Sequence, residues 1–282
     1  MKPPSLADIV GGLHALPSLP TVVMEVLQSM GDEDVDIDRL ARGISHDQAL
    51  AARTLRVANS PFYGMQGKID TIAEAITVLG FVNVRSLVMA VGISSAWPVG
   101  GDAGFDARIF WRHSLGVASC AATLAPYAKL PPDTLFLAGL LHDIGRLVLV
   151  VTSAATCAEI LQRRQREDCL LFKAESEVLG FDHAQIGSEL CRHWRIPPPI
   201  AGAVERHHAV DPAAGAGPAD MVDVVHVADV LAHALDMAGD PDGLVPPPAA
   251  GAWRRLDLSP PDLRSAIEQA ERQFSGFANL LG

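Results

Sequence analysis

Apolar residues recur at three- and four-residue spacing along nearly the whole chain, and this periodicity restricts the possible folds more than any other feature. The pattern is clear over residues 22–30 and again over residues 110–124. Such spacing places apolar side chains on one face of a helix, whereas a half-buried strand needs alternation with a period of two. Period-two alternation is nearly absent, so no sheet is expected. The sequence therefore predicts an all-α fold.

Segments rich in glycine and proline divide the helical pattern. The run Trp97 to Asp102, WPVGGD, predicts a boundary between an N-terminal helical subdomain (residues 1–100) and a C-terminal one (residues 101–282). Loops are also expected at residues 59–64, 211–220 and 240–251. In the C-terminal subdomain, helices are expected over residues 110–127, 133–151, 155–165, 175–180, 184–194, 199–208 and 222–237.

Composition favours a compact globular protein in the cytoplasm. The chain is 49% hydrophobic and 20% charged, and no run of about 18 uncharged apolar residues predicts a membrane span. The first residues lack the charged start and continuous apolar run of a secretory signal. The cysteines show no CxxC pairing and are expected to pack as small hydrophobic residues. They are Cys120, Cys157, Cys169 and Cys191.

The charge balance argues against direct binding of nucleic acid. The formal net charge is −11, which repels a phosphate backbone unless a local basic patch compensates. The densest basic run, residues 162–166, is better explained as the solvated face of a helix.

Histidine and aspartate lie on predicted apolar helix faces in the second half of the chain. His142 and Asp143 are embedded in the apolar run AGLLHDIGRL, where burial without partners would be costly. Gly139 and Gly145, three positions on either side of His142, would let the groove around this pair close. His183 begins a predicted helix, which Asp182 can cap and Gln185 can support by a return hydrogen bond. The other candidates are His113, His207, His208 and Asp229.

Each of these residues alone is better explained as a hydrogen-bonded core residue, but together they favour a metal site. Imidazole and carboxylate are ligands of Zn, Fe, Mn and similar cations, and a buried polar cluster of this size needs positive charge at its centre. An inert hydrogen-bonded core remains the alternative. The other histidines are predicted to have no role, and His226 is the main candidate for an exception because it lies one turn from Asp229. They are His14, His46, His193, His226 and His233.

The order His, His-Asp, His, His-His, Asp on successive helices resembles the HD superfamily of metal-dependent phosphohydrolases. The segments LPSLP, LRVANSPFYG, TIAEAITVLG, AGLLHDIGRL, GFDHAQIGSEL, HWRIPPPI and ERHH narrow the resemblance to the HDOD family, the HD-related output domains of bacterial signalling proteins. The resemblance covers residues 12–275. It implies an N-terminal helical bundle packed on an HD-like helical core, and a role as an output or interaction module.

The resemblance also implies specific roles for the candidate residues. Its leading implication is a signalling module with a retained metal site, binding a protein partner or a small nucleotide signal. The alternative is a metal-dependent phosphohydrolase acting on a nucleotide or cyclic dinucleotide, in which Arg146 would neutralise phosphate charge. A divalent Fe, Mn, Zn or similar ion is expected, with up to two ions. His113, His142, Asp143 and Asp229 would hold the first, and His183, His207 and His208 the second.

The sequence departs from catalytic relatives at two places, and the first of these departures favours the module. The phosphodiesterases with a GYP motif carry a glycine-rich element after the paired histidines, whereas here Ala209-Val210-Asp211-Pro212 follows. A glutamate that some three-metal relatives use one turn before the first histidine is replaced by Ile109, so a third ion is not expected.

Overall fold

The structure is a computed structural model that describes residues 3–16, 18–29, 35–60, 68–97, 104–210 and 217–278. The prediction of an all-α fold is confirmed, because helices are the regular elements of these ranges and no strand occurs in them. The predicted boundary at residue 100, and parts of the loops predicted at 59–64 and 211–220, fall outside the described residues. The boundary stays a prediction.

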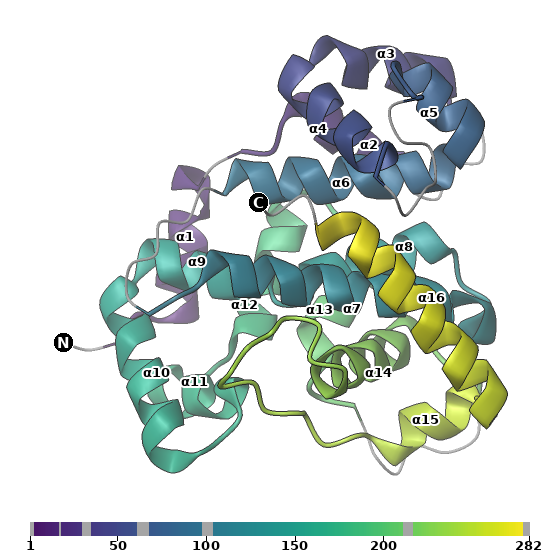
Figure 1. Cartoon of the computed structure of the whole chain (residues 1–282). Helices are drawn as coiled ribbons and strands as arrows, with labels where there is room; N and C mark the ends of the chain where they lie inside the picture. Colours follow the sequence, from purple (N-terminus) through teal and green to yellow (C-terminus); the bar gives the residue numbers. More distant parts are fainter. Residues whose placement is uncertain are drawn as a thin grey trace.

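Most of the N-terminal helices gather at one end of the molecule, with the last of them lying between this group and the rest, whereas the first lies apart, against C-terminal helices (Figure 1). Thr71 caps the start of α5, since its hydroxyl accepts a hydrogen bond from the Glu74 amide at 3.1 Å. These elements are α1 (Leu6–Gly12), the 3₁₀ turn η1 (Leu13–Ala15), α2 (Thr21–Gln28), α3 (Ile37–His46), α4 (Gln48–Ala58), α5 (Ile72–Leu79) and α6 (Phe81–Ala96).

The longer C-terminal part is organised around α7, which packs along α8, α14 and α16. Gly139 permits the closest of these contacts, because a Cβ atom there would lie 2.8 Å from Ala118 Cα on α7. The helices of this part are α7 (Ala107–Ala128), α8 (Pro132–Leu141), α9 (Ile144–Thr152), α10 (Ala154–Glu167), α11 (Leu171–Leu179), α12 (His183–His193), α13 (Pro198–Arg206), α14 (Met221–Ala234), α15 (Ala250–Leu256) and α16 (Pro260–Ala278).

The two parts share one hydrophobic core, which includes buried residues from Ile9 to Phe277. Helix α6 packs on α8, and α1 packs on α9 and α12. A buried ion pair joins Arg85 of α6 to Asp133 of α8, and Arg85 also donates to the Ser29 carbonyl oxygen at 3.4 Å. The N-terminal helices are therefore tied to the C-terminal ones by polar as well as apolar contacts.

The helical stretch Pro132–Thr152 is long and apolar enough to cross a membrane by length and composition, and its most apolar 18 residues are 83% buried inside the protein. The predicted single helix over residues 133–151 is wrong in one respect: it is interrupted at His142 and Asp143, where α8 ends and α9 begins. Asp143 has φ −100° and ψ 6°, outside the regular helical values.

Candidate metal centre

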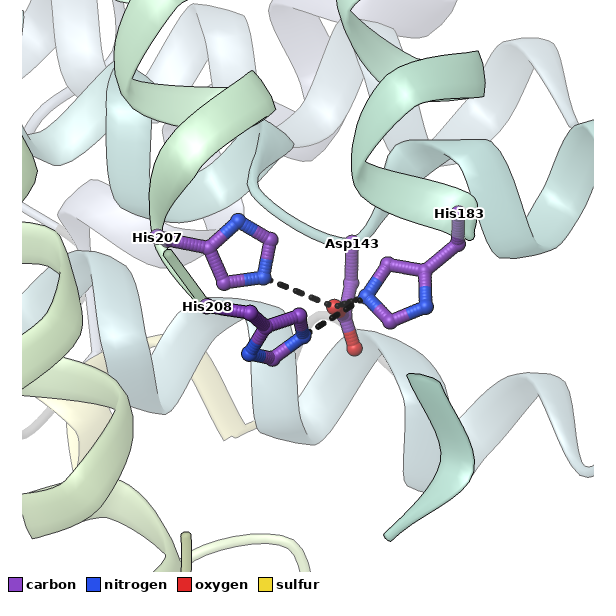
Figure 2. A group of neighbouring side chains, drawn as sticks. All are labelled: Asp143, His183, His207 and His208. Carbon is purple, nitrogen blue, oxygen red and sulfur yellow. Dashed lines mark hydrogen bonds and ion pairs between the residues drawn. The ribbon is translucent and has the colours of Figure 1, made fainter. Parts of the chain in front are cut away.

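The structure brings together all the side chains that the sequence suggests as metal ligands, from six helices or their ends. His208 is half-buried and the others are buried. Figure 2 shows four of them turned toward one another. Helix α7 carries His113, the break between α8 and α9 carries His142 and Asp143, α12 begins with His183, α13 is followed by His207 and His208, and α14 carries Asp229.

The break between α8 and α9 explains how two adjacent residues face the same centre. Neighbouring side chains on a continuous helix point about 100° apart, so they could not both be directed inward. At the break, Asp143 Oδ1 lies 3.4 Å from His142 Nε2 and 2.9 Å from His183 Nε2. Asp143 is thus the residue that connects the two sides of the centre.

The close approach of α9 and α12 depends on Gly145. A Cβ atom at this position would lie 2.0 Å from the carbonyl oxygen of His183. The glycine lets the helix that follows Asp143 pack directly on the start of the helix that carries His183, as the glycine spacing suggests.

Backbone carbonyl groups fix the orientation of two imidazoles. His142 Nδ1 lies 2.7 Å from the Gly139 carbonyl oxygen, and His207 Nδ1 lies 2.7 Å from the Val204 carbonyl oxygen. Because a carbonyl oxygen only accepts, each Nδ1 must carry the hydrogen. In the neutral imidazole the lone pair is then on Nε2, which faces the centre. Fixing a tautomer in this way prepares a histidine to bind a metal ion.

His183 is oriented by a carboxylate instead. Glu175 of α11 is buried, and its Oε2 accepts hydrogen bonds from His183 Nδ1 at 2.6 Å and from the His183 amide at 2.9 Å. The predicted cap of α12 is present: Asp182 accepts from the Gln185 amide, and the Gln185 side chain accepts from the Asp182 amide. Glu175 was not predicted, because its partner lies on a different helix.

An aromatic stack positions His208. Its ring lies on the Phe172 ring with the centroids 4.2 Å apart and the planes at 18°. His208 Nε2 faces His183 Nε2 at 3.1 Å. Phe172 therefore supports this imidazole by stacking on its face.

Asp229 and His113 form the other side of the centre. His113 Nε2 lies 3.2 Å from Asp229 Oδ1 and 3.1 Å from His142 Nε2. His233, for which no role is expected from the sequence, also belongs here: its Nε2 is 3.4 Å from Asp229 Oδ1. His226 turns away, since its Nδ1 donates to the His207 carbonyl oxygen at 2.9 Å and its Nε2 accepts from the Ala249 amide.

Burial and neighbouring charges set the protonation states. Burial lowers the pKa of His142 to about 3, and burial together with His207 and His183 lowers the pKa of His208 well below its usual value. Burial alone would raise the pKa of Asp143, but the adjacent histidines and Arg146 hold it well below its usual range. Neutral imidazoles beside an ionised carboxylate are the states that metal binding requires.

His183 differs from the other histidines. Burial alone would lower its pKa, but Glu175 and Asp143 raise it well above its usual value. Without a metal ion, His183 is therefore protonated on both ring nitrogens, and the proton on Nε2 points to Asp143. A metal ion bound at Nε2 would replace this proton.

Buried nitrogen and oxygen atoms without hydrogen bonds indicate that the cluster fits a cation. His207 Nε2 and Asp229 Oδ1 are buried and make no hydrogen bond. A buried polar atom without a partner costs about 1–3 kcal/mol, which coordination to an ion would recover. Three sets of donor atoms lie within 4.8 Å of one another: Asp143, His183, His207 and His208; His113, His142 and Asp143; and His113, Asp229 and His233.

A narrow cavity of about 60 Å³ reaches the centre from the surface. Arg146, predicted to contact phosphate only if the protein is an enzyme, lines this cavity. Its Nη1 donates to Asp143 Oδ2 at 2.9 Å, and its guanidinium lies over the Phe110 ring. Arg146 also lines a neighbouring cavity of about 360 Å³ between α7, α9, α10 and α11. The guanidinium is thus bound to a candidate metal ligand at the junction of the two cavities.

Comparisons with known proteins agree with this architecture. The chain is similar to a Geobacter sulfurreducens HDOD domain protein of unknown function, with 25% identity, a TM-score of 0.80 and coverage of 98% of this chain and 96% of that one. It is also similar to a candidate phosphohydrolase from Shewanella amazonensis, with 26% identity, a TM-score of 0.76 and coverage of 97% and 98%.

A longer relative and a family model also match the chain. An uncharacterised Treponema pallidum protein is 23% identical over 205 residues, which are 72% of this chain but 39% of the relative, so the chain spans well under half of that protein. The family model of the HDOD domain matches residues 16–210, which include every candidate ligand except Asp229 and His233. The chain belongs to the HDOD family.

Proposed function

We propose that this chain is a bacterial signal-transduction output module of the HDOD type that holds a divalent metal ion at the buried centre. The observation that carries the proposal is the set of inward-facing polar atoms that lack hydrogen-bond partners: the buried Nε2 of His207 and Oδ1 of Asp229 make no hydrogen bond. The fixed tautomers of His142 and His207 support the same conclusion. An ion is the partner that satisfies all of these groups together.

The donor sets divide the centre into two parts. Asp143, His183, His207 and His208 would hold one ion, and His113, His142 and Asp229 would hold a second, with Asp143 within reach of both. Imidazole with carboxylate suits Fe, Mn, Zn or similar ions. A bound ion would supply Lewis acidity and positive charge in the core.

The narrow opening favours a module over an enzyme. Pockets for small ligands are typically about 300–1,000 Å³, whereas the opening to the centre measures about 60 Å³. Arg146 Nη1 donates to Asp143, which uses part of its guanidinium within the protein. We therefore propose that the output is made through a protein partner or a small nucleotide signal, in the cytoplasm, and that direct binding to nucleic acid or membrane plays no part.

A metal-dependent phosphohydrolase is the second candidate, favoured by the cavity of about 360 Å³ beside the centre. The relative from Shewanella amazonensis, a candidate phosphohydrolase, supports it as well. In this function Arg146 would leave Asp143 and pair with a phosphate group of a nucleotide or cyclic dinucleotide.

Elemental analysis and an activity screen test the two functions. Purified protein is expected to contain Fe, Mn, Zn or a similar ion, and the variants His142→Ala and Asp143→Ala are expected to lose it. A metal-free wild-type protein that also fails to bind added Mn²⁺ or Fe²⁺ would refute the metal centre. If the wild-type protein hydrolysed nucleotides or cyclic dinucleotides with either added ion, and both variants had lost this activity, the phosphohydrolase would be the correct function and the non-catalytic module would be refuted.

A further inference from the structure

One histidine at the centre lies outside both proposed ligand sets. His233 is in the last turn of α14, four residues after Asp229, and its ring centroid lies 4.4 Å from that of His113. We infer that His233 is a direct ligand of a divalent transition-metal ion, which His113 and Asp229 also bind. This inference rests on the proposed metal centre.

The spacing along α14 permits both side chains to reach one ion. Residues four apart on a helix are neighbours on the same face, and pairs of metal ligands commonly use this spacing. His233 Nε2 and His113 Nε2 lie 3.4 Å and 3.2 Å from the same oxygen, Asp229 Oδ1. The three donor atoms therefore converge on one point from two helices, α7 and α14.

Hydrogen bonding within the protein does not account for this arrangement. Asp229 Oδ1 is buried and makes no hydrogen bond, although both imidazoles are close to it. If His233 were only a partner for the carboxylate, its ring would be expected to donate to Oδ1 with hydrogen-bond geometry. An ion bound between the three side chains would explain why their nitrogen and oxygen atoms face one another without hydrogen bonds.

Exposure distinguishes His233 from the other ligands and suggests what it does. Its side chain is 24% exposed, whereas those of His113 and Asp229 are 5% and 3% exposed. His233 also lines the cavity of about 60 Å³. With His142, which the proposed function assigns to the same ion, the ligands are three imidazoles and one carboxylate, a set that suits ions such as Fe²⁺. This ion is therefore the one that a small molecule entering through the opening would meet.

Titration with Co²⁺ tests the assignment, because visible absorption counts the bound ions and reports their coordination. In metal-free protein, His233→Ala is expected to weaken one class of Co²⁺ site by at least about ten-fold and to change its absorption, leaving the other class unchanged. The control His46→Ala, at an exposed histidine in the last turn of α3, is expected to behave as wild type. If His233→Ala unfolds at a lower temperature than wild type, the same titration is made with His233→Gln, which keeps a polar side chain but removes the imidazole.

The possible results separate this inference from the proposed function. Wild-type affinity, stoichiometry and absorption in both His233 variants would refute the role of His233 while leaving the metal centre in place. Failure of the wild-type protein to bind Co²⁺ would refute the centre itself, and the inference with it. Recovery of the absorption of the His233→Ala protein on addition of free imidazole would support direct coordination at the cavity mouth.

Discussion

The packing of α9 on α12 should control metal binding through a single glycine, Gly145. An alanine Cβ at this position would lie 2.0 Å from the His183 carbonyl oxygen and 2.7 Å from the Gly187 amide nitrogen. Since Cβ atoms essentially never lie closer than 3.0 Å to such atoms, the two helices must separate by about 1 Å. The atoms in conflict belong to backbone, so no side-chain rotation can relieve the overlap.

The expected cost follows from two opposing effects. Overpacking of this kind costs about 1–3 kcal/mol, toward the upper end because backbone must move, while the change from glycine to alanine in a helix gains at most about 1 kcal/mol. A net loss of about 1–2 kcal/mol of unfolding free energy is expected for Gly145→Ala. Metal–ligand distances tolerate about 0.2 Å, so a shift of about 1 Å between Asp143 and His183 should also lower metal affinity by at least about ten-fold.

Urea unfolding and metal titration of the same variant measure both effects. Gly11→Ala is the matched control, because Gly11 lies in α1 and a Cβ there would meet nothing within 4 Å. The control should be neutral or slightly stabilising and should bind metal as wild type does. If Gly145→Ala retained wild-type stability and metal affinity, the contact between α9 and α12 would not be what places Asp143 next to His183.

Three further predictions concern other contacts. Glu175→Gln should weaken metal binding by about 10–100-fold in a metal titration, because the amide no longer strengthens His183 as a donor, while the exposed Glu177→Gln should bind as wild type. The pKa of His183 is raised in the metal-free protein, so protonated His183 stabilises the folded state. This contribution to the free energy of unfolding is complete below about pH 6.5 and is lost as the pH rises through the raised pKa. Metal binding should accordingly release a proton, measured by calorimetry in buffers of different ionisation enthalpy, and an unchanged heat across buffers would contradict this. Asp133→Ala should cost about 3–5 kcal/mol in urea unfolding by leaving Arg85 buried and unpaired, and Arg85→Met combined with Asp133→Leu should recover most of it.

The fold and most of the candidate site could be predicted because they depend on local sequence patterns. Helical periodicity and capping residues specify each helix, and a buried imidazole or carboxylate on an apolar face is visible in sequence. The break at His142 and Asp143 left no such signal, because the apolar pattern continues from residues 135–141 into residues 144–150. The break is imposed by tertiary packing, in which α8 lies against α7 and α9 against α12.

The residues that sequence analysis missed all depend on contacts between helices. His226 and His233 lie three residues before and four after Asp229, so both are allowed by helix geometry. The neighbours of α14 determine which of the two lies at the centre. His226 donates a hydrogen bond to the His207 carbonyl oxygen at the end of α13, whereas His233 lies beside His113 of α7. Glu175 likewise becomes significant only when α11 is packed against the start of α12.

The histidines that close α8 and α13 have a consequence for how quickly metal can be exchanged. Each forms part of the end of its helix through a hydrogen bond to the carbonyl group three residues earlier. The imidazoles are therefore fixed in the core whether or not an ion is present, and an ion could leave only if helices moved apart or through the narrow opening. We therefore expect the bound ion to be released slowly. The identity of the ion in each molecule should then depend on which metals were available when the chain folded, and less on those available later.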